Sequence, residues 1–348
     1  MKTLNTLLAF LMTITVGFAQ KYDDSKPYMV KTFTANTVKS LKMTTSGGSL
    51  TVVGTTDAEA KIEVYVRSNN WNGSGDNLSK EDIEERLERY ELTVTQEGSS
   101  LIAYAKNKSN NWDKKSLSIA FKAYVPEKSI TDLNTSGGSI SVKGITENVN
   151  GKTSGGSITV RNCKNNVNLK TSGGSISADN TSGNIVLTTS GGSISATDLD
   201  GTIDLKTSGG SISLDALKGK ISAITSGGSI KATELRGESM VKTSGGSIML
   251  REIYGTLSAA TSAGSIDAEI LALGKSLDLN VSSGNMTVRM PFNKGITLDC
   301  TANKITRESS MNNFDGEIEK TSIRGKLNGG GIPVNLRVST GNLTLKSL

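Results

Sequence analysis

Few residues in this chain of 348 have the chemistry that catalysis or metal binding usually needs. Histidine is absent, which excludes a Ser-His-Asp or Cys-His nucleophile, a His-ligated zinc or haem site and an imidazole pH switch. The cysteines are only two, Cys163 and Cys300. We therefore predict no catalytic residue, no bound metal and no cofactor.

Two Asn-Asn-Trp triplets are the best candidates for a binding site. Trp71 follows Asn70, Trp112 follows Asn111, and each triplet comes directly after a predicted strand. An exposed tryptophan beside an asparagine suits a sugar, because the ring stacks on it while the amide forms hydrogen bonds. The simpler interpretation is that the two rings pack over a cap. We keep these four residues as candidate binding residues.

A Thr-Ser-Gly-Gly-Ser repeat dominates the rest of the chain. It begins at Thr135, recurs every 18 residues through Thr243, and has a variant copy at Thr261. Such strict spacing predicts that each repeat stacks on the one before it. The repeat lacks the lysine and helix of a phosphate-binding loop and the aspartate of the calcium-binding nonapeptide. We interpret it as a tight corner whose hydroxyls hydrogen-bond to each other between coils.

Residues at equal places in successive repeats form columns, and we number these places by their distance from the repeat threonine. Places 5 and 7, and again 14 and 16, are apolar, which is the alternation of two strands per repeat. Place 5 is isoleucine in all eight copies, and we predict it as the buried core ladder: Ile140, Ile158, Ile176, Ile194, Ile212, Ile230, Ile248 and Ile266.

This pattern predicts an all-β fold, a single-stranded parallel β-solenoid of 18-residue coils. Strand twist favours right-handed coiling, while a left-handed solenoid of three hexapeptides per coil remains the alternative. Glycine, at 38 residues, supplies two corners per coil. Cys163 falls in a leucine column and is predicted to be a buried thiol. Cys300 lies about seven coils away, ~34 Å at ~4.8 Å per coil, so we predict no disulfide.

Serine and threonine flank the core isoleucine and are predicted to point outward. They form a two-column array of hydroxyls: Ser139 with Ser141, Ser157 with Thr159, Ser175 with Ser177, Ser193 with Ser195, and Ser211 with Ser213. Ice-binding solenoids display similar arrays, but threonine is scarce here, and Lys231 and Met249 interrupt the second column. We therefore interpret this face as a surface for a polymer or a protein.

The N-terminus predicts export. A basic start at Lys2 precedes an apolar run and a Gly-Phe-Ala-Gln sequence with small residues at the cleavage positions, so residues 1–19 are a predicted signal peptide. The apolar run is shorter than the ~20 residues of a membrane span, and no second run of spanning length follows. We expect the mature chain to have no transmembrane segment and to be periplasmic, on the cell surface or extracellular.

The repeat also divides the mature chain. An isolated copy at Thr45 belongs to a first coil, and degenerate copies start at Val281 and Val338. We predict a helix over about 80–90, where Ser79 and Asp82 resemble a capping box. The predicted regions are 20–53 for the first strands and coil, 54–134 for an N-terminal cap insertion of antiparallel strands and this helix, 135–290 for the regular solenoid, and 291–348 for C-terminal coils and a β cap.

Three features together carry a family resemblance: the Thr-Ser-Gly-Gly-Ser-Ile repeats, the helix-bearing insertion, and the end Gly325-Lys326-Leu327-Asn328-Gly329-Gly330-Gly331. They resemble the bacterial "putative adhesin" β-solenoid family, which is related to the "head GIN" domain of autotransporter adhesins. The resemblance covers nearly all of the mature chain. It implies an exported or envelope-associated β-solenoid, and it brings no catalytic or binding residues to carry over.

These observations favour an exported, non-catalytic, adhesin-like envelope or surface protein. Its repetitive Ser/Thr face would bind a glycan, an envelope polymer or a protein, and we expect no nucleic-acid partner. The net charge of +6 favours anionic glycans only weakly. One alternative is a β-helix polysaccharide-active enzyme, although coils of identical length leave no room for the loops that wall a catalytic cleft. Another is a structural or regulatory envelope element joined through its caps.

Overall fold

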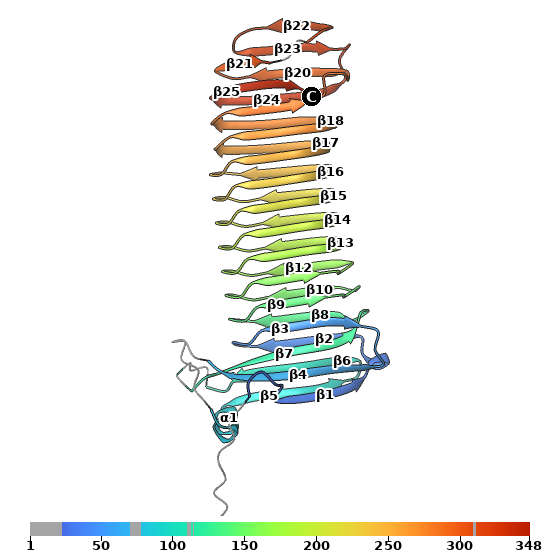
Figure 1. Cartoon of the computed structure of the whole chain (residues 1–348), viewed down its shortest axis with the longest axis vertical. Helices are drawn as coiled ribbons and strands as arrows, with labels where there is room; N and C mark the ends of the chain where they lie inside the picture. Colours follow the sequence, from blue (N-terminus) through green and yellow to red (C-terminus); the bar gives the residue numbers. More distant parts are fainter. Residues whose placement is uncertain (1–22, 70–77, 110–112, 114, 309–310) are drawn as a thin grey trace, which may run out of the picture.

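The chain forms a tall stack of β coils whose strands run across its long axis (Figure 1). The computed structural model describes residues 23–69, 78–109, 113, 115–308 and 311–348. The predicted signal peptide, 1–19, lies outside them. Neighbouring strands along the stack are mostly parallel, and Ile176 pairs with Ile194, 18 residues on. The prediction of a parallel β-solenoid with 18-residue coils is confirmed.

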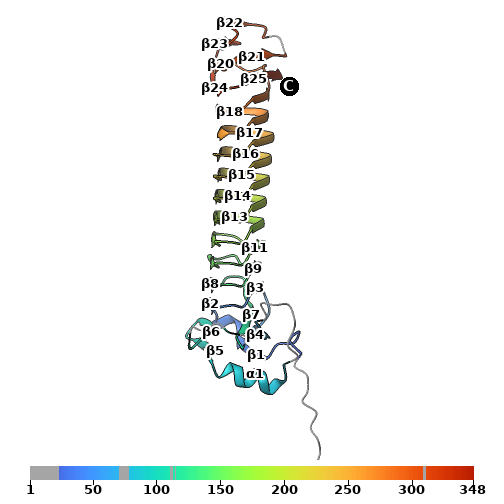
Figure 2. The same ribbon diagram turned by 90° about the vertical axis from the view of Figure 1, so that its left-hand side faces the viewer.

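The solenoid contains these strands: β2 (Ser40–Thr45), β3 (Leu50–Thr55), β8 (Ile130–Thr135), β9 (Ile140–Lys143), β10 (Val149–Lys152), β11 (Ile158–Arg161), β12 (Asn166–Lys170), β13 (Ile176–Thr188), β14 (Ile194–Lys206), β15 (Ile212–Ile224), β16 (Ile230–Thr243), β17 (Ile248–Ala263), β18 (Ile266–Ser283) and β19 (Met286–Met290). The stack is narrow when it is turned by 90° (Figure 2). Each coil is therefore flattened and has two broad faces.

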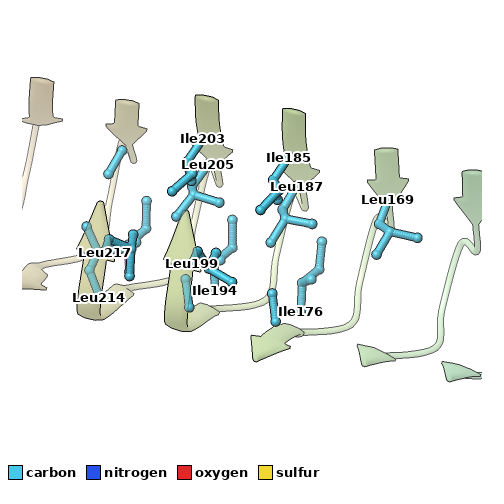
Figure 3. Close-up of a cluster of buried hydrophobic side chains, with 14 of the residues drawn as sticks. Leu169, Ile176, Ile185, Leu187, Ile194, Leu199, Ile203, Leu205, Leu214 and Leu217 are labelled. Atoms are coloured by element: carbon cyan, nitrogen blue, oxygen red, sulfur yellow. The ribbon is translucent and has the colours of Figure 1, made fainter. Parts of the chain in front are cut away.

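The core lies between these two faces. All eight isoleucines at place 5 are buried, and leucines and isoleucines at places 14 and 16 come from the other side of the coil, as Figure 3 shows for Ile185, Leu187 and Leu205. A side chain added at Gly151, place 16, would lie 3.5 Å from Ile140 Cδ1, at place 5 of the same coil. Places 5 and 16 therefore pack against each other, and a core only two side chains thick has little room for rings.

The threonine that opens each repeat is buried, and it bonds to backbone rather than to other hydroxyls. Thr225 Oγ1 donates to the carbonyl of Gly210 in the preceding coil at 2.8 Å, and it accepts from the Gly228 amide at 3.3 Å. The predicted hydroxyl–hydroxyl ladder is therefore wrong. Buried backbone groups at a corner have no strand partner, so they take the available hydroxyl.

Six consecutive coils, from the Thr153 repeat to the Thr243 repeat, have left-handed backbone at two places. The glycines at place 12 have positive φ, for example +114° at Gly219. In these six coils place 9 is left-handed as well, although its residues are not glycine: Asn162, Asn180, Asp198, Ala216, Glu234 and Glu252. The glycine at place 12 was predicted as a corner. The turn at place 9 was not, because only asparagine and aspartate among these residues favour that conformation.

The N-terminal cap departs from the order of the sequence. Its elements are β1 (Met29–Thr34), a 3-10 turn (Ala35–Thr37), β4 (Glu59–Ser68), α1 (Lys80–Leu87), β5 (Tyr90–Glu97), β6 (Ser100–Asn107) and β7 (Leu117–Pro126). Strands β2 and β3 pair directly with β8 and β9, so the isolated repeat at Thr45 stacks on the Thr135 coil. The intervening β6 and β7 pair in parallel with the opposite edges of β2 and β3. Within the insertion, β4 pairs with β7 and β5 with β6 in antiparallel orientation, as predicted.

Helix α1 begins as predicted and ends earlier. Ser79 and Asp82 form a capping box, in which the Asp82 amide donates to Ser79 Oγ at 3.1 Å. The helix ends at Leu87 instead of about residue 90, because Tyr90 already opens β5. The Tyr90 hydroxyl is buried and accepts a hydrogen bond from the Leu117 amide at 2.7 Å, which holds this residue in the sheet.

The C-terminal cap also changes the order of the strands. It consists of β20 (Ile296–Thr301), β21 (Lys304–Arg307), β22 (Phe314–Ile318), β23 (Ser322–Leu327), β24 (Ile332–Thr340) and β25 (Asn342–Ser347). The last strands, β24 and β25, lie on β18 and β19 and carry β20 and β21 on their other edges. The C-terminus is therefore inside the stack, below β20–β23 (Figure 1).

Both cysteines are free and buried. Burial raises the pKa of the Cys300 thiol to about 12, and burial also raises the pKa of Cys163 above its ordinary value. Cys163 is fully buried, which confirms the prediction of a core thiol. Its Sγ donates to the Arg161 carbonyl at 3.3 Å.

Candidate binding face

The predicted hydroxyl array lies along one broad face of the solenoid, which we call the serine face. It consists of the outward residues at places 4 and 6. A shallow groove of about 510 Å³ runs along it over β11, β13, β14 and β15. Serines from Ser157 to Ser229 and Thr159 line the groove above the backbone of the core isoleucines, and Lys231 stands at one end.

The repeat explains why this face is a groove. Isoleucine at place 5 points inward, so places 4 and 6 must point outward by strand alternation. Place 4 is serine in all eight copies and place 6 in four of them, and this small side chain leaves the space above the strand open. Identical residues pair from coil to coil, for example Ser195 with Ser213. The face therefore repeats its hydroxyls every ~4.8 Å along the stack.

The serines at place 4 are anchored but still able to donate. The amide of Ser229 donates to Ser211 Oγ at 3.3 Å, and Ser193 Oγ accepts from the Ser211 amide at 3.2 Å. A hydroxyl that accepts from the backbone keeps its own proton for a ligand. The serines at place 4 thus form a row of oriented hydroxyls, each held by the next coil.

At its N-terminal end the serine face meets a charged aromatic cluster that the sequence did not predict. Strand β7 pairs with β3 and β4, which places Lys122 beside Thr51 and Glu63. Glu63 accepts from Lys61 at 2.7 Å, and the Lys61 and Lys122 ammonium groups lie 4.5 and 5.0 Å from the centre of the Tyr124 ring. These charged groups and the Tyr124 ring interact with one another, and the serine face ends at this cluster.

At the other end an ion triad crosses three coils. Asp267, at place 6, accepts from Arg251 Nη2 at 2.5 Å and from Arg289 Nη1 at 2.8 Å. Burial opposes the ionisation of Asp267, but the two arginine hydrogen bonds outweigh it and hold the pKa of this carboxyl below its ordinary value near 3.8. The triad joins β17, β18 and β19, so its role here is cohesion between coils.

Acid should weaken this triad. Because the folded-state pKa of Asp267 lies below the unfolded one, its stabilisation is present above about pH 4 and is lost as the pH falls through the folded value. We expect Asp267→Asn to have a lower melting temperature than wild type at pH 7. The difference between the two melting temperatures should shrink as the pH falls to about 3. Melting curves from pH 7 to 3 measure this difference. Asp215→Asn, which removes an exposed carboxylate at place 8 of another coil, is the control. A constant difference between wild type and Asp267→Asn at every pH would contradict the prediction.

The four predicted binding residues, Asn70, Trp71, Asn111 and Trp112, lie outside the described residues. The bases of their two loops are adjacent, since the Asn69 amide donates to the Ser116 carbonyl at 2.9 Å. Their role in binding stays a prediction. Among the described residues, no group of His, Cys, Asp and Glu side chains is placed to hold a metal ion, and no described helix is long and apolar enough to cross a bilayer.

The sequence matches the family model Toastrack DUF4097 over residues 55–236. This range starts at the end of β3 and runs through the N-terminal cap into β16. No curated protein matches the chain.

Three solved structures resemble the chain at low scores. A "putative cell adhesion protein" from Clostridium sporogenes is 13% identical, with a TM-score of 0.19, and covers 93% of this chain and 100% of its own. A "putative adhesin" from Bacteroides fragilis is 12% identical, with a TM-score of 0.24, and the match covers 92% of this chain and 96% of that protein. A "putative lipid binding protein" from Parabacteroides distasonis is 10% identical, with a TM-score of 0.25, and the match covers 93% of this chain and 97% of that protein. TM-scores this low say nothing about what this chain binds.

Proposed function

The chain belongs to the Toastrack DUF4097 family, and from this premise we propose that it is an exported, non-catalytic β-solenoid of the cell envelope or surface. In this proposal the serine face binds an extended polysaccharide whose chain runs along the stack. The observation that carries the proposal is the groove of about 510 Å³ between two columns of outward hydroxyls.

The regular register supports an extended ligand rather than a compact one. Successive coils present the same pair of side chains, as Ser177, Ser195 and Ser213 do through β13, β14 and β15. A polymer with its own repeat can make the same contact at several coils, and contacts linked in one chain reinforce each other. Hydroxyl donors and acceptors fit the hydroxyls of a sugar chain.

The charges beside the groove support a neutral polymer. At place 8 of the coils from β9 to β15, Lys143 and Arg161 are followed by Asp179, Thr197 and Asp215. The two signs balance along this stretch. Serines, a threonine, isoleucines and one lysine line the groove, whereas glycoside cleavage uses a pair of carboxylates. This lining supports binding rather than catalysis.

The test fills the groove without adding charge. We expect Ser177→Gln/Ser195→Gln to weaken the retention of neutral polysaccharides on a glycan array about tenfold or more, because the longer side chains occupy the space of the ligand. Asn184→Gln/Thr202→Gln is the matched control, since both residues are exposed on the opposite face of the same two coils. It should bind like wild type.

Two results would contradict this proposal. One is wild-type retention by the groove variant. The other is a wild type that binds no polysaccharide on the array but captures an envelope protein through the same serines, which would make the ligand a protein. Circular dichroism of each variant shows whether the solenoid remains folded.

A further inference from the structure

A second hollow region lies on the opposite broad face, within the N-terminal cap. It surrounds Tyr104, a half-buried residue on β6. The register places Tyr104 between Thr44 on β2 and Thr93 on β5, and Thr44 in turn lies beside Asn134 on β8. The ring on β6 therefore stands in one row with small polar side chains from three other strands.

Two cavities meet at this row. One of about 580 Å³ extends toward β5, and one of about 430 Å³ extends toward the repeat corner. Thr44, Tyr104 and Asn134 line both of them. The two cavities therefore adjoin at Tyr104, and each has a size suited to a small ligand or a segment of a chain.

The Tyr104 ring differs from those of Tyr254 and Tyr124, which cations cover. Tyr254 lies under the Arg236 guanidinium, 4.1 Å from it, and two lysines cover Tyr124. Among the described residues, no cation or second ring covers Tyr104. A half-buried ring that neither a described cation nor a described ring covers can offer a stacking surface in a polar hollow.

The polar groups beside the ring suit hydroxyl ligands. Asn134 Nδ2 donates to Asp132 Oδ1 at 3.1 Å, which orients this amide while its oxygen can still accept from a ligand. Three lysines and three carboxylates line the two cavities. They are Lys42, Lys106, Lys152, Glu91, Glu97 and Asp132. Lys42 and the three carboxylates line the cavity toward β5, and Lys106 and Lys152 line the other. The formal charges cancel over the two cavities taken together, so a ligand that spans both meets no net charge.

We propose that this hollow is a binding site for a pyranose unit of a neutral glycan, with the apolar face of the sugar stacked on Tyr104. Thr44, Thr93 and Asn134 bond to the sugar hydroxyls, and the lysines and carboxylates at the rim bond to those farther out. The site uses neither the serine face nor the Asn-Asn-Trp loops. It would therefore bind a sugar even if the serine face binds none.

Calorimetric titration with neutral hexasaccharides of glucose, mannose and N-acetylglucosamine tests this site, with hexagalacturonate as the acidic comparison. We expect at least one neutral hexasaccharide to bind more tightly than hexagalacturonate. Tyr104→Ala should weaken that binding about tenfold, a loss of about 1.4 kcal/mol. Tyr104→Phe keeps the stacking surface and should stay within about threefold of wild type. Tyr254→Ala, whose ring lies under Arg236, is the matched control.

Several results would overturn the proposal: no neutral hexasaccharide bound at 10 mM, unchanged affinity in Tyr104→Ala, or an equal loss in Tyr104→Phe and Tyr104→Ala. Because Tyr104→Phe removes only a hydroxyl, a loss confined to Tyr104→Ala cannot be assigned to a missing hydrogen bond. The groove variant Ser177→Gln/Ser195→Gln should retain the hexasaccharide affinity. A failure of the proposed Tyr104 site is thus distinguishable from a failure of the proposed binding at the serine face.

Discussion

Gly210→Ala is expected to unfold at a much lower urea concentration than wild type, while Gly209→Ala, one residue away, should unfold close to wild type. A Cβ at Gly210 would lie 2.0 Å from the Gly192 carbonyl oxygen and 2.4 Å from its carbon. Both atoms are backbone of the coil below, so no side chain can move aside. The two coils would have to separate.

At Gly209 the nearest atom to an added Cβ is the Gly191 carbonyl oxygen, at 3.5 Å, which is ordinary contact. The chain itself contains this substitution, since Ala263 stands at the equivalent place of the Thr261 repeat. We expect Gly210→Ala to cost about 3 kcal/mol of unfolding free energy, and Gly209→Ala to change it by less than about 1 kcal/mol. Urea unfolding followed by circular dichroism measures both free-energy changes. Equal unfolding midpoints for Gly210→Ala and Gly209→Ala would contradict the close approach of Gly210 to the Gly192 backbone.

Removal of residues 332–348 should detach the C-terminal cap and cause the shortened chain to associate. Strand β24 pairs with β18 on one edge and β20 on the other, so its loss opens two strand edges. The deletion also removes five buried aliphatic side chains, which together contribute on the order of 10 kcal/mol. They are Val334, Leu336, Val338, Leu343 and Leu345. Unpaired edges of parallel strands are templates for another chain.

Analytical ultracentrifugation and hydrogen exchange test this deletion. We expect oligomers, together with loss of amide protection in β20 and β23. Removing only Leu348, whose side chain is 52% exposed, is the control and should leave a protected monomer. A shortened chain that stays monomeric, with β20 protected as in wild type, would show that the cap does not depend on the last two strands.

The regular part of the fold could be predicted almost completely from the sequence. Equal spacing of the Thr-Ser-Gly-Gly-Ser copies predicts equal coils, and the alternation around Ile194 or Ile212 assigns inward and outward sides. Both signals are local, because the side-chain direction of a strand alternates residue by residue. The outward serines followed from the same alternation, and the groove between them required only that serine is small.

Other features depended on contacts that no spacing reveals. The left-handed turn at place 9 is occupied by Ala216 and Glu234 as well as by Asn180, so its residue types gave no common signal. The threonine hydroxyls were expected to bond to one another, but Thr225 bonds to backbone. Which partner a buried hydroxyl takes is decided by the groups left unpaired around it.

The sequence alone therefore determined the coil length, the inward columns and the hydroxyl face, since each follows from a pattern repeated along the chain. Only the tertiary structure decided the order of strands at the two ends, where Thr45 stacks on Thr135 and Val281 on Val338. It also brought Tyr104, Thr44 and Asn134 into one row. The physical reason is that the free edge of a strand can form a parallel pair with any strand of matching length and register. Segments far apart in the sequence can therefore become neighbours even though no regular sequence spacing relates them.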